Sequence, residues 1–208
     1  LAWTILQAKA SGLFAKIAVS SDNAAILDVA RDYGADYLVD RPAEMATDEA
    51  GKVGAIRHCL LEAEQRFGQK VDVFVDLDAT SPLRFVEDIV GSVALLHDTG
   101  APNVITGCTA RRSPYFNLVE RDAAGHVHLA IPPAEEVLRR QDAPACFDMN
   151  GSVYVWRRDH FVDNPSVFYD DTRLFEMPED RSIDIDTPVD FELVKLLQAR
   201  QIAEGLTV

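Results

Sequence analysis

Two aspartates stand two residues apart near the end of the chain, in the segment Ile183-Asp184-Ile185-Asp186-Thr187-Pro188. In an extended segment, side chains two residues apart point the same way, so Asp184 and Asp186 share one face. Side-by-side carboxylates repel each other, and a bound Mg²⁺ (or Mn²⁺) relieves that repulsion because it takes oxygen ligands. The spacing predicts a divalent-metal site. The alternative is that Asp186 caps a helix that begins near Pro188.

A second polar segment follows the strongest β-branched run of the chain, Val71–Leu77. It reads Asp76-Leu77-Asp78-Ala79-Thr80-Ser81-Pro82-Leu83-Arg84. Thr80 and Ser81 offer hydroxyl groups, and the guanidinium of Arg84 can hold an anion through two parallel hydrogen bonds. The segment is therefore a candidate binding loop. An ordinary strand-to-helix turn is the alternative, because Ser-Pro commonly begins turns.

Between residues 108 and 150, basic residues occur in two adjacent pairs, Arg111-Arg112 and Arg139-Arg140, and the second pair is followed by Gln141-Asp142. In a chain with only 20 Lys and Arg residues, such pairs indicate recognition of a carboxylate or a phosphate. Salt bridges on a solvated or intersubunit face are the alternative. The five histidines show no metal-ligand spacing on a predicted helix.

The overall charge limits the classes of partner. The 208 residues carry 34 Asp and Glu against 20 Lys and Arg, which gives a formal net charge of −14. This excess disfavours binding to a nucleic acid and to an anionic membrane surface, and no apolar run approaches the ~20 residues of a membrane helix. The three widely spaced cysteines predict free thiols. We therefore expect a cytoplasmic protein with small substrates.

The elements that must position these residues alternate between helix and strand. The hydrophobic spacing predicts helices at Leu1–Ala8, Ala24–Tyr33, Val53–Phe67, Val86–His97 and Asp190–Gln201. Strands are predicted at Lys16–Ser20, Tyr37–Val39, Val71–Leu77, Asn103–Cys108, Ser152–Trp156 and Arg173–Met177. This alternation predicts an α/β fold with a mostly parallel sheet and helices on both faces.

The alternation breaks after Gly107, where Tyr115–Glu120 and His126–Ala130 have the pattern of a hairpin. We therefore expect one α/β domain formed by residues 1–107 and 151–208, with an inserted lobe at residues 108–150. Ligands of open parallel sheets bind at the carboxyl ends of the strands. The loops expected at the site are Ser20–Asp22, Asp78–Arg84, Thr106–Arg112 and Asn150-Gly151.

Taken together, these segments resemble the CMP-sialic acid synthetases (acylneuraminate cytidylyltransferases) over nearly the whole chain. Six pieces occur in the order of that family: Val19–Asp22, Arg41–Glu44 with Asp48, Ala79–Arg84, Arg139–Asp142, Asn150–Tyr154 and Asp184–Pro188. The resemblance implies a Rossmann-like nucleotidyltransferase sheet and an inserted lobe that forms a homodimer. It implies transfer of CMP from CTP to the anomeric hydroxyl of a nonulosonic (sialic-type) acid, with release of pyrophosphate.

The resemblance also implies roles for individual residues. Asp184 and Asp186 are expected to bind the catalytic Mg²⁺ (or Mn²⁺), with Ser81 and Arg84 at the same site. The nucleotide is expected to lie against Ser21, Asp22, Arg41 and Ala50. The sugar acid is expected to lie near Arg140, Gln141, Asp78 and Asn150, with Arg140 and Gln141 reaching across the dimer interface.

Two departures from the family pattern matter. The family's phosphate-binding strand and loop are expected to precede Leu1, and a chain without them is expected to be nearly inactive. The family usually has Gln at the position of Asp78. A carboxylate beside an anionic sugar is unfavourable unless a metal, a proton or an amino group compensates. Asp78 therefore indicates a different sugar, an additional metal contact or tolerated variation.

Two alternative functions remain open at this point. A homologue that binds nucleotide or sugar without turnover is consistent with Asp78 and with the absence of the phosphate-binding segment. A related octulosonate cytidylyltransferase is a second alternative, which the Arg139–Asp142 segment disfavours because it resembles the sialic-type enzymes.

Overall fold

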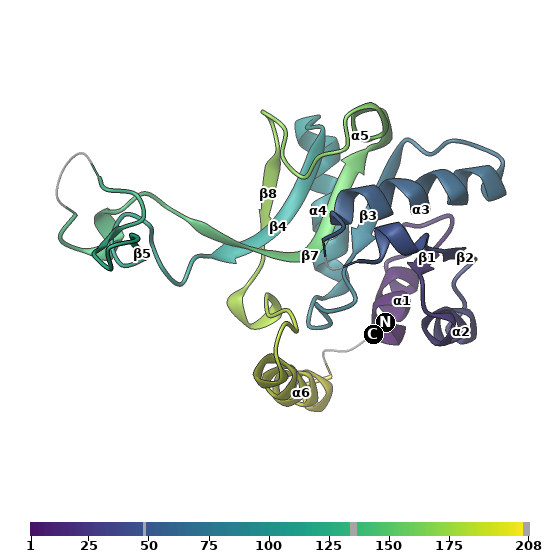
Figure 1. The fold of residues 1–208 in the computed structure, drawn as a ribbon. Coiled ribbons are helices and arrows are strands. Elements are labelled where there is room, and N and C mark those ends of the chain that lie inside the picture. Colours follow the sequence, from purple (N-terminus) through teal and green to yellow (C-terminus); the bar gives the residue numbers. More distant parts are fainter. Residues whose placement is uncertain (48, 134–136, 206–208) are drawn as a thin grey trace.

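The computed structural model describes residues 1–47, 49–133 and 137–205 (Figure 1), so Asp48 lies outside the described residues. The described residues form six α-helices: α1 (Ala2–Ala10), α2 (Ala24–Asp32), α3 (Lys52–Phe67), α4 (Val86–Thr99), α5 (Arg158–Asp163) and α6 (Pro188–Ala203). The same residues also form eight strands: β1 (Ala18–Ser21), β2 (Tyr37–Asp40), β3 (Val73–Leu77), β4 (Asn103–Thr109), β5 (Val119–Arg121), β6 (Val127–Leu129), β7 (Phe147–Arg157) and β8 (Arg173–Glu176). Every helix and strand that the sequence predicts is present, and α5 is an additional element.

The central sheet has the strand order β3-β7-β4-β8. The strands β4 and β8 are parallel, whereas β7 runs antiparallel to both β3 and β4. The α/β class is therefore confirmed, but the sheet is mixed where a mostly parallel sheet was expected. The physical reason is the connection from β4 to β7, whose described residues form no crossover helix and which returns the chain as an antiparallel neighbour.

Helices cover both faces of this sheet, as predicted, because β7 alternates its side chains. Tyr154 and Trp156 pack on one face with Leu60 of α3 and Phe161 of α5. On the other face, the core residues of β7 and β4 pack with those of α4; this second cluster comprises Val153, Val155, Val104, Ile89 and Leu96. Successive side chains of β7 point to opposite faces of the sheet, so this one strand contributes to both hydrophobic clusters.

The strands β1 and β2 form a separate parallel pair, in which Ala18 lies opposite Tyr37. The helices α2 and α3 both contact this pair. Among the described residues, β1 and β3 are edge strands of their two sheets. A cavity lies between them, and it contains part of the candidate site.

The segment between β4 and β7 carries the hairpin β5–β6 and extends away from the central sheet (Figure 1). The strand β7 begins at Phe147 rather than at Ser152, so β4 and β7 continue together into the base of this segment. Gly107 lies where the register of that pair shifts. A Cβ atom at Gly107 would approach the carbonyl oxygen of Asp148 to 2.7 Å, which explains the glycine at this close approach.

Candidate active site

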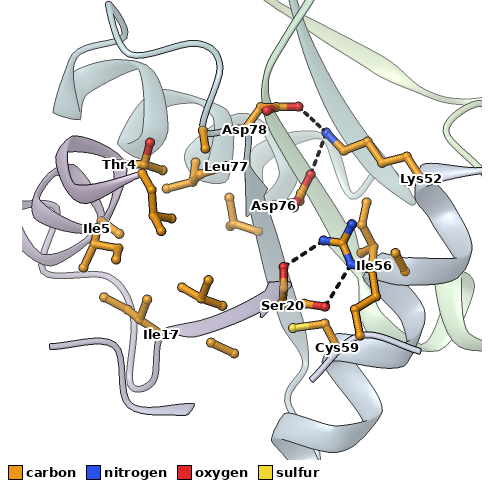
Figure 2. Close-up of a pocket in the computed structure, with 18 of the residues that line it drawn as sticks. Thr4, Ile5, Ile17, Ser20, Lys52, Ile56, Cys59, Asp76, Leu77 and Asp78 are labelled. Carbon is orange, nitrogen blue, oxygen red and sulfur yellow. Dashed lines mark hydrogen bonds and ion pairs between the residues drawn. The ribbon is translucent and has the colours of Figure 1, made fainter. Parts of the chain in front are cut away.

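A cavity of about 510 Å³ opens between α1, β1, the start of α3 and the carboxyl end of β3 (Figure 2). Its lining changes from apolar to polar. Leu1, Ile5 and Ile17 contribute apolar surface, whereas the residues at the other end are Ser20, Arg41, Lys52, Asp76 and Asp78. The polar end coincides with the carboxyl ends of β1 and β3, which is the edge of the sheet where ligands were expected.

Two of the four residues predicted to bind the nucleotide, Arg41 and Ala50, line this cavity. The guanidinium of Arg41 donates hydrogen bonds to the carbonyl oxygen of Ser20 at 2.8 Å and to its Oγ at 3.3 Å. Ser21 is buried, and its Oγ accepts a hydrogen bond from the backbone N–H of Asn23 at 3.1 Å. The hydroxyl of Ser21 thus shapes the turn after β1, and Asp22 is exposed beside it. Nucleotide binding by these four residues stays a prediction.

Lys52, which was not among the predicted site residues, forms two ion pairs at the polar end of the cavity. Its Nζ lies 2.9 Å from Oδ2 of Asp76 and 2.9 Å from Oδ2 of Asp78 (Figure 2). The same ammonium lies 4.4 Å from the centre of the Tyr154 ring. The only sequence signal for this cluster was the two-residue spacing of Asp76 and Asp78, which is the spacing that drew attention to Asp184 and Asp186.

These ion pairs fix the charges of the cluster. Burial disfavours the charged form of Lys52, but the carboxylates of Asp76 and Asp78 outweigh it and raise the pKa of the lysine above its usual value. Burial likewise disfavours ionisation of Asp78, but the Lys52 ammonium and the hydrogen bonds from Thr80 hold the pKa of that carboxyl below its usual value. Lys52 is therefore a cation and Asp78 an anion at neutral pH.

The segment that carries Asp184 and Asp186 lies against the loop after β3, because the backbone N–H of Ile185 donates a hydrogen bond to the carbonyl oxygen of Thr80 at 3.0 Å. The N-cap of α6 is Thr187, whose hydroxyl and backbone exchange hydrogen bonds with Asp190 in a capping box. Asp186 therefore does not cap this helix, and the alternative role weighed for it is removed.

The carboxylates of this segment suit a divalent cation. Burial raises the pKa of Asp184, and the negative charges of Asp186, Asp190 and Asp78 raise it further. Such repulsion is what a bound Mg²⁺ or Mn²⁺ relieves. No group of three or more His, Cys, Asp and Glu side chains with metal-ligand geometry occurs in the described part of the chain. Metal binding by Asp184 and Asp186 stays a prediction; two carboxylates are compatible with it, because Mg²⁺ commonly takes its other ligands from water and substrate phosphates.

Arg84 and Ser81 are buried at the base of the loop after β3, each with about 1% of its surface exposed. Arg84 donates hydrogen bonds to the carbonyl oxygen of Ser152 at 2.6 Å and to the carbonyl oxygen of Asp78. It also donates to Oε1 of Gln7 and Oγ1 of Thr4, both in α1 and both at 3.3 Å. The guanidinium is thus engaged by protein groups, and in this structure it fixes the loop to α1 and β7.

Asn150 is also buried and joins three segments of the site. Its Oδ1 accepts hydrogen bonds from Oγ1 of Thr106 at 2.7 Å and from the backbone N–H of Ser152 at 3.1 Å. Its Nδ2 donates to Oγ of Ser182 at 3.0 Å, two residues before Asp184. The carbonyl oxygen of Asn150 accepts a hydrogen bond from Ser81 at 3.4 Å. Asn150 therefore holds the segments of the predicted site together through buried hydrogen bonds. Its contact with the sugar stays a prediction.

Arg140 and Gln141 lie in a short 3₁₀ helix, Arg140–Asp142, in the projecting segment. Arg140 lines a second, smaller cavity of about 290 Å³ together with Thr109, Arg111, Glu176 and the chain at Met177–Glu179. This cavity shares no lining residue with the first one. Within one described chain, the structure therefore does not bring Arg140 to the cavity that contains Asp78.

Comparison with known proteins adds the following findings. The chain matches the family model described as Cytidylyltransferase over residues 1–206. It is 38% identical over 197 residues to the post-translational flagellin modification protein B of Campylobacter coli, which covers 95% of this chain and 83% of that protein. It is 39% identical over 197 residues to a CMP-N,N'-diacetyllegionaminic acid synthase of Campylobacter jejuni, with the same coverage.

Among solved structures, a CMP:2-keto-3-deoxy-manno-octonic acid synthetase complexed with CTP aligns with a TM-score of 0.62 at 16% identity, over 95% of this chain and 88% of that one. This likeness concerns the fold. In the described residues, no helix combines the length and the apolar character needed to cross a membrane.

Proposed function

The chain belongs to the cytidylyltransferase family, in the branch of the CMP-sialic acid synthetase type, and on that premise we propose that it transfers CMP from CTP to the anomeric hydroxyl of a nonulosonic acid and releases pyrophosphate. One observation carries the assignment of the site: the hydrogen bond between Ile185 and Thr80 places the Asp184–Asp186 segment against the loop of Asp78. The relative named as a diacetyllegionaminic acid synthase supports a substrate of the nonulosonic acid class.

In this reaction the protein mainly positions the two substrates and neutralises charge. Arg41 and Ala50 line the polar half of the cavity and are proposed to contact the cytidine part of CTP. Asp184 and Asp186 are proposed to hold Mg²⁺ (or Mn²⁺). When bound, that ion supplies a Lewis acid that neutralises phosphate charge and lowers the pKa of the attacking hydroxyl. Asn150 joins the loop after β3 to the segment just before Asp184 through buried hydrogen bonds. Arg84 fixes the same loop to α1 and β7.

The phosphate-binding strand and loop expected from the family resemblance are proposed to lie between β1 and β3. The support is that both are edge strands of their sheets among the described residues and that the cavity separates them. Ile17 beside β1 and Val75 and Leu77 of β3 give that cavity an apolar wall of the kind that an added strand covers. The loop after such a strand would emerge at the polar end, next to Lys52.

A homodimer is proposed to complete the sugar site. Arg140 lies apart from the cavity of Asp78 within one chain, so a second copy must deliver its guanidinium if it binds the sugar carboxylate. The projecting segment and its base expose apolar side chains that a second copy would cover: Leu118, Val119, Val127, Ile131, Leu138, Phe147 and Met149. Exposed apolar side chains that gather in one part of a protein mark interaction sites. We also propose a cytoplasmic location, which the free thiols of Cys59, Cys108 and Cys146 support.

The test is to identify the product. The full-length protein is incubated with CTP, Mg²⁺ and each of several nonulosonic acids, and the products are separated and weighed by mass spectrometry. A CMP ester of a nonulosonic acid is the expected product. Binding of CTP or sugar by calorimetry with no such ester would instead favour the non-catalytic homologue, and an ester formed only with an eight-carbon sugar acid would favour the octulosonate enzyme.

A further inference from the structure

Lys52 occupies the first position of α3, which is an unfavourable place for a cation. The free N–H groups at a helix N-terminus give this end a partial positive charge, so acidic side chains are favoured there and lysine is not. Contacts at the polar end of the cavity explain a lysine at this helix position. Its ammonium is held by Asp76, by Asp78 and by the face of the Tyr154 ring. Three partners, from β3, from the loop after it and from β7, thus fix one flexible side chain.

The hydrogen bonds of Asp78 show which acceptor sites of its carboxylate are occupied and which remain free. Its Oδ1 accepts hydrogen bonds from the backbone N–H of Thr80 at 3.1 Å and from the hydroxyl of Thr80 at 2.9 Å. Its Oδ2 accepts from Lys52 at 2.9 Å. An ionised carboxylate has about four acceptor sites and no donor. One acceptor site on Oδ2 therefore remains, on a half-buried group that lines the cavity.

Lys52 also reduces the repulsion that the carboxylate of Asp78 would exert on an anionic sugar. The hydrogen bond from Ile185 to Thr80 holds the Asp184–Asp186 segment against the loop of Asp78, so negative charge accumulates where an anionic sugar is proposed to approach. The ammonium of Lys52 is shared by Asp76 and Asp78 and offsets one of their two charges. Without Lys52, the negative charge of Asp76 beside it would favour protonation of Asp78, and a protonated Asp78 would become a donor.

We propose that Lys52 and Asp78 act as one specificity-determining pair, in which Lys52 keeps Asp78 ionised and oriented so that Oδ2 accepts a hydrogen bond from a neutral donor of the sugar acid. The donor is an acylamino N–H or a hydroxyl, and a group that can only accept is rejected at this position. This inference rests on the proposed function. It makes Lys52 a positioning residue that acts through Asp78, and it assigns the pair to the sugar rather than to the nucleotide.

The test compares steady-state constants of the full-length protein and four variants: Lys52→Met, Lys52→Arg, Asp78→Asn and the double variant Lys52→Met/Asp78→Asn. We expect Lys52→Met to raise the KM for the sugar about tenfold, the size of one hydrogen bond to a charged group, with a smaller change in kcat and in the KM for CTP. Lys52→Arg should recover much of the loss. The double variant should be no worse than Lys52→Met, because no unpaired carboxylate is left at position 78.

The matched control is Lys195→Met, an exposed lysine of α6 that pairs with Glu192, and thermal unfolding confirms that each variant is folded. Sugar analogues identify the donor. If the donor is an acylamino N–H, the natural enzyme should prefer the acylamino sugar over the analogue that lacks this group more strongly than Asp78→Asn does. If it is a hydroxyl, the same difference should appear with a deoxy analogue.

Three results would overturn the pairing: an unchanged sugar KM in Lys52→Met, effects of the two single variants that simply add, or a rise confined to the KM for CTP. Equal discrimination by the natural enzyme and Asp78→Asn against every analogue would overturn the donor assignment. These outcomes require an active natural enzyme. If the natural enzyme shows no sugar-dependent turnover at all, the proposed function itself has failed.

Discussion

The backbone N–H of Ile185 donates a hydrogen bond to the carbonyl oxygen of Thr80 at 3.0 Å. Ile185 stands between Asp184 and Asp186, and Thr80 follows Asp78 by two residues, so this bond fixes the proposed metal-binding segment against the loop at the end of β3. The distance between the segment proposed to bind metal and the loop proposed to bind sugar is therefore set by a backbone hydrogen bond, which varies less than a contact between two side chains.

Replacing Asp186 with Asn should lower kcat by roughly 100-fold, because Lewis-acid stabilisation by a bound metal is worth several kcal/mol. The fold should be retained, since Thr187 and not Asp186 caps α6. Pyrophosphate release measured against Mg²⁺ concentration checks this expectation. The matched control is Asp180→Asn, an exposed aspartate in the short helix Glu179–Arg181. Equal rates in Asp186→Asn and the natural enzyme would refute the metal assignment.

Arg84→Met should lower the free energy of unfolding by about 3 kcal/mol, because it leaves the buried carbonyl oxygens of Asp78 and Ser152 without their donor. Urea denaturation of the variant and the natural protein measures this difference. Arg84→Lys should be only partly tolerated, because one ammonium cannot reach all the acceptors of the guanidinium. A variant with full stability and lost turnover would show that Arg84 acts on substrate, as the sequence predicted, and not through the fold.

The buried pair of Glu64 and Arg158 should make stability depend on pH. Two hydrogen bonds of 2.7 and 3.0 Å join them. Burial opposes ionisation of Glu64, but these bonds and the backbone N–H of Val71 outweigh it and hold the pKa of the carboxyl below its usual value. The stabilisation is thus present above the unfolded pKa of about 4.3 and is lost as the pH falls through the lower pKa of the folded state.

Glu64→Gln should therefore cost about 3 kcal/mol of unfolding free energy at pH 7, as expected when one partner of a buried ion pair is removed. The difference from the natural protein should shrink as the solution is acidified below about pH 4, because Glu64 then becomes neutral as well. Urea denaturation at several pH values measures both. A difference that stayed constant over this range would contradict the assignment.

Val127→Asp should weaken the proposed homodimer without destabilising the single chain, because Val127 lies on the projecting hairpin and is 62% exposed. A charge placed in a covered apolar interface is costly, whereas on an open surface it is tolerated. Phe168→Asp is the matched control, since Phe168 is 63% exposed but lies in the loop before β8. Sedimentation should show monomers for Val127→Asp alone, and equal dimer fractions in both variants would argue against an interface on the hairpin.

The sequence predicted elements better than it predicted their pairing. Helices and strands follow from hydrophobic spacing and from stops such as Gly68, which ends α3 with a positive φ. The direction of β7 does not follow from local pattern, because it depends on how the chain returns from the projecting segment. The helix α5 escaped prediction because it is short and directly continues β7 at Arg158.

For the site too, the sequence predicted local features but not the contacts between distant segments. Asp184 and Asp186 were found because two-residue spacing places side chains on one face, and Asp78 was found because it follows the strongest predicted strand. The structure brings their segments together. Lys52 was missed because its partners, Asp76 and Asp78, come from a different part of the chain. Arg84 was predicted from its residue type, which cannot tell a guanidinium that faces a substrate from one that holds buried carbonyl groups.

The central claim is that this site uses CTP and a nonulosonic acid, and the most direct test is the rate of pyrophosphate release by the full-length protein. The reaction is run with CTP and Mg²⁺, with and without each sugar acid. We predict release that requires the sugar, the nucleotide and the metal together, and that falls with Asp186→Asn. Release that is independent of the sugar, or no release with any nonulosonic acid, would contradict the account.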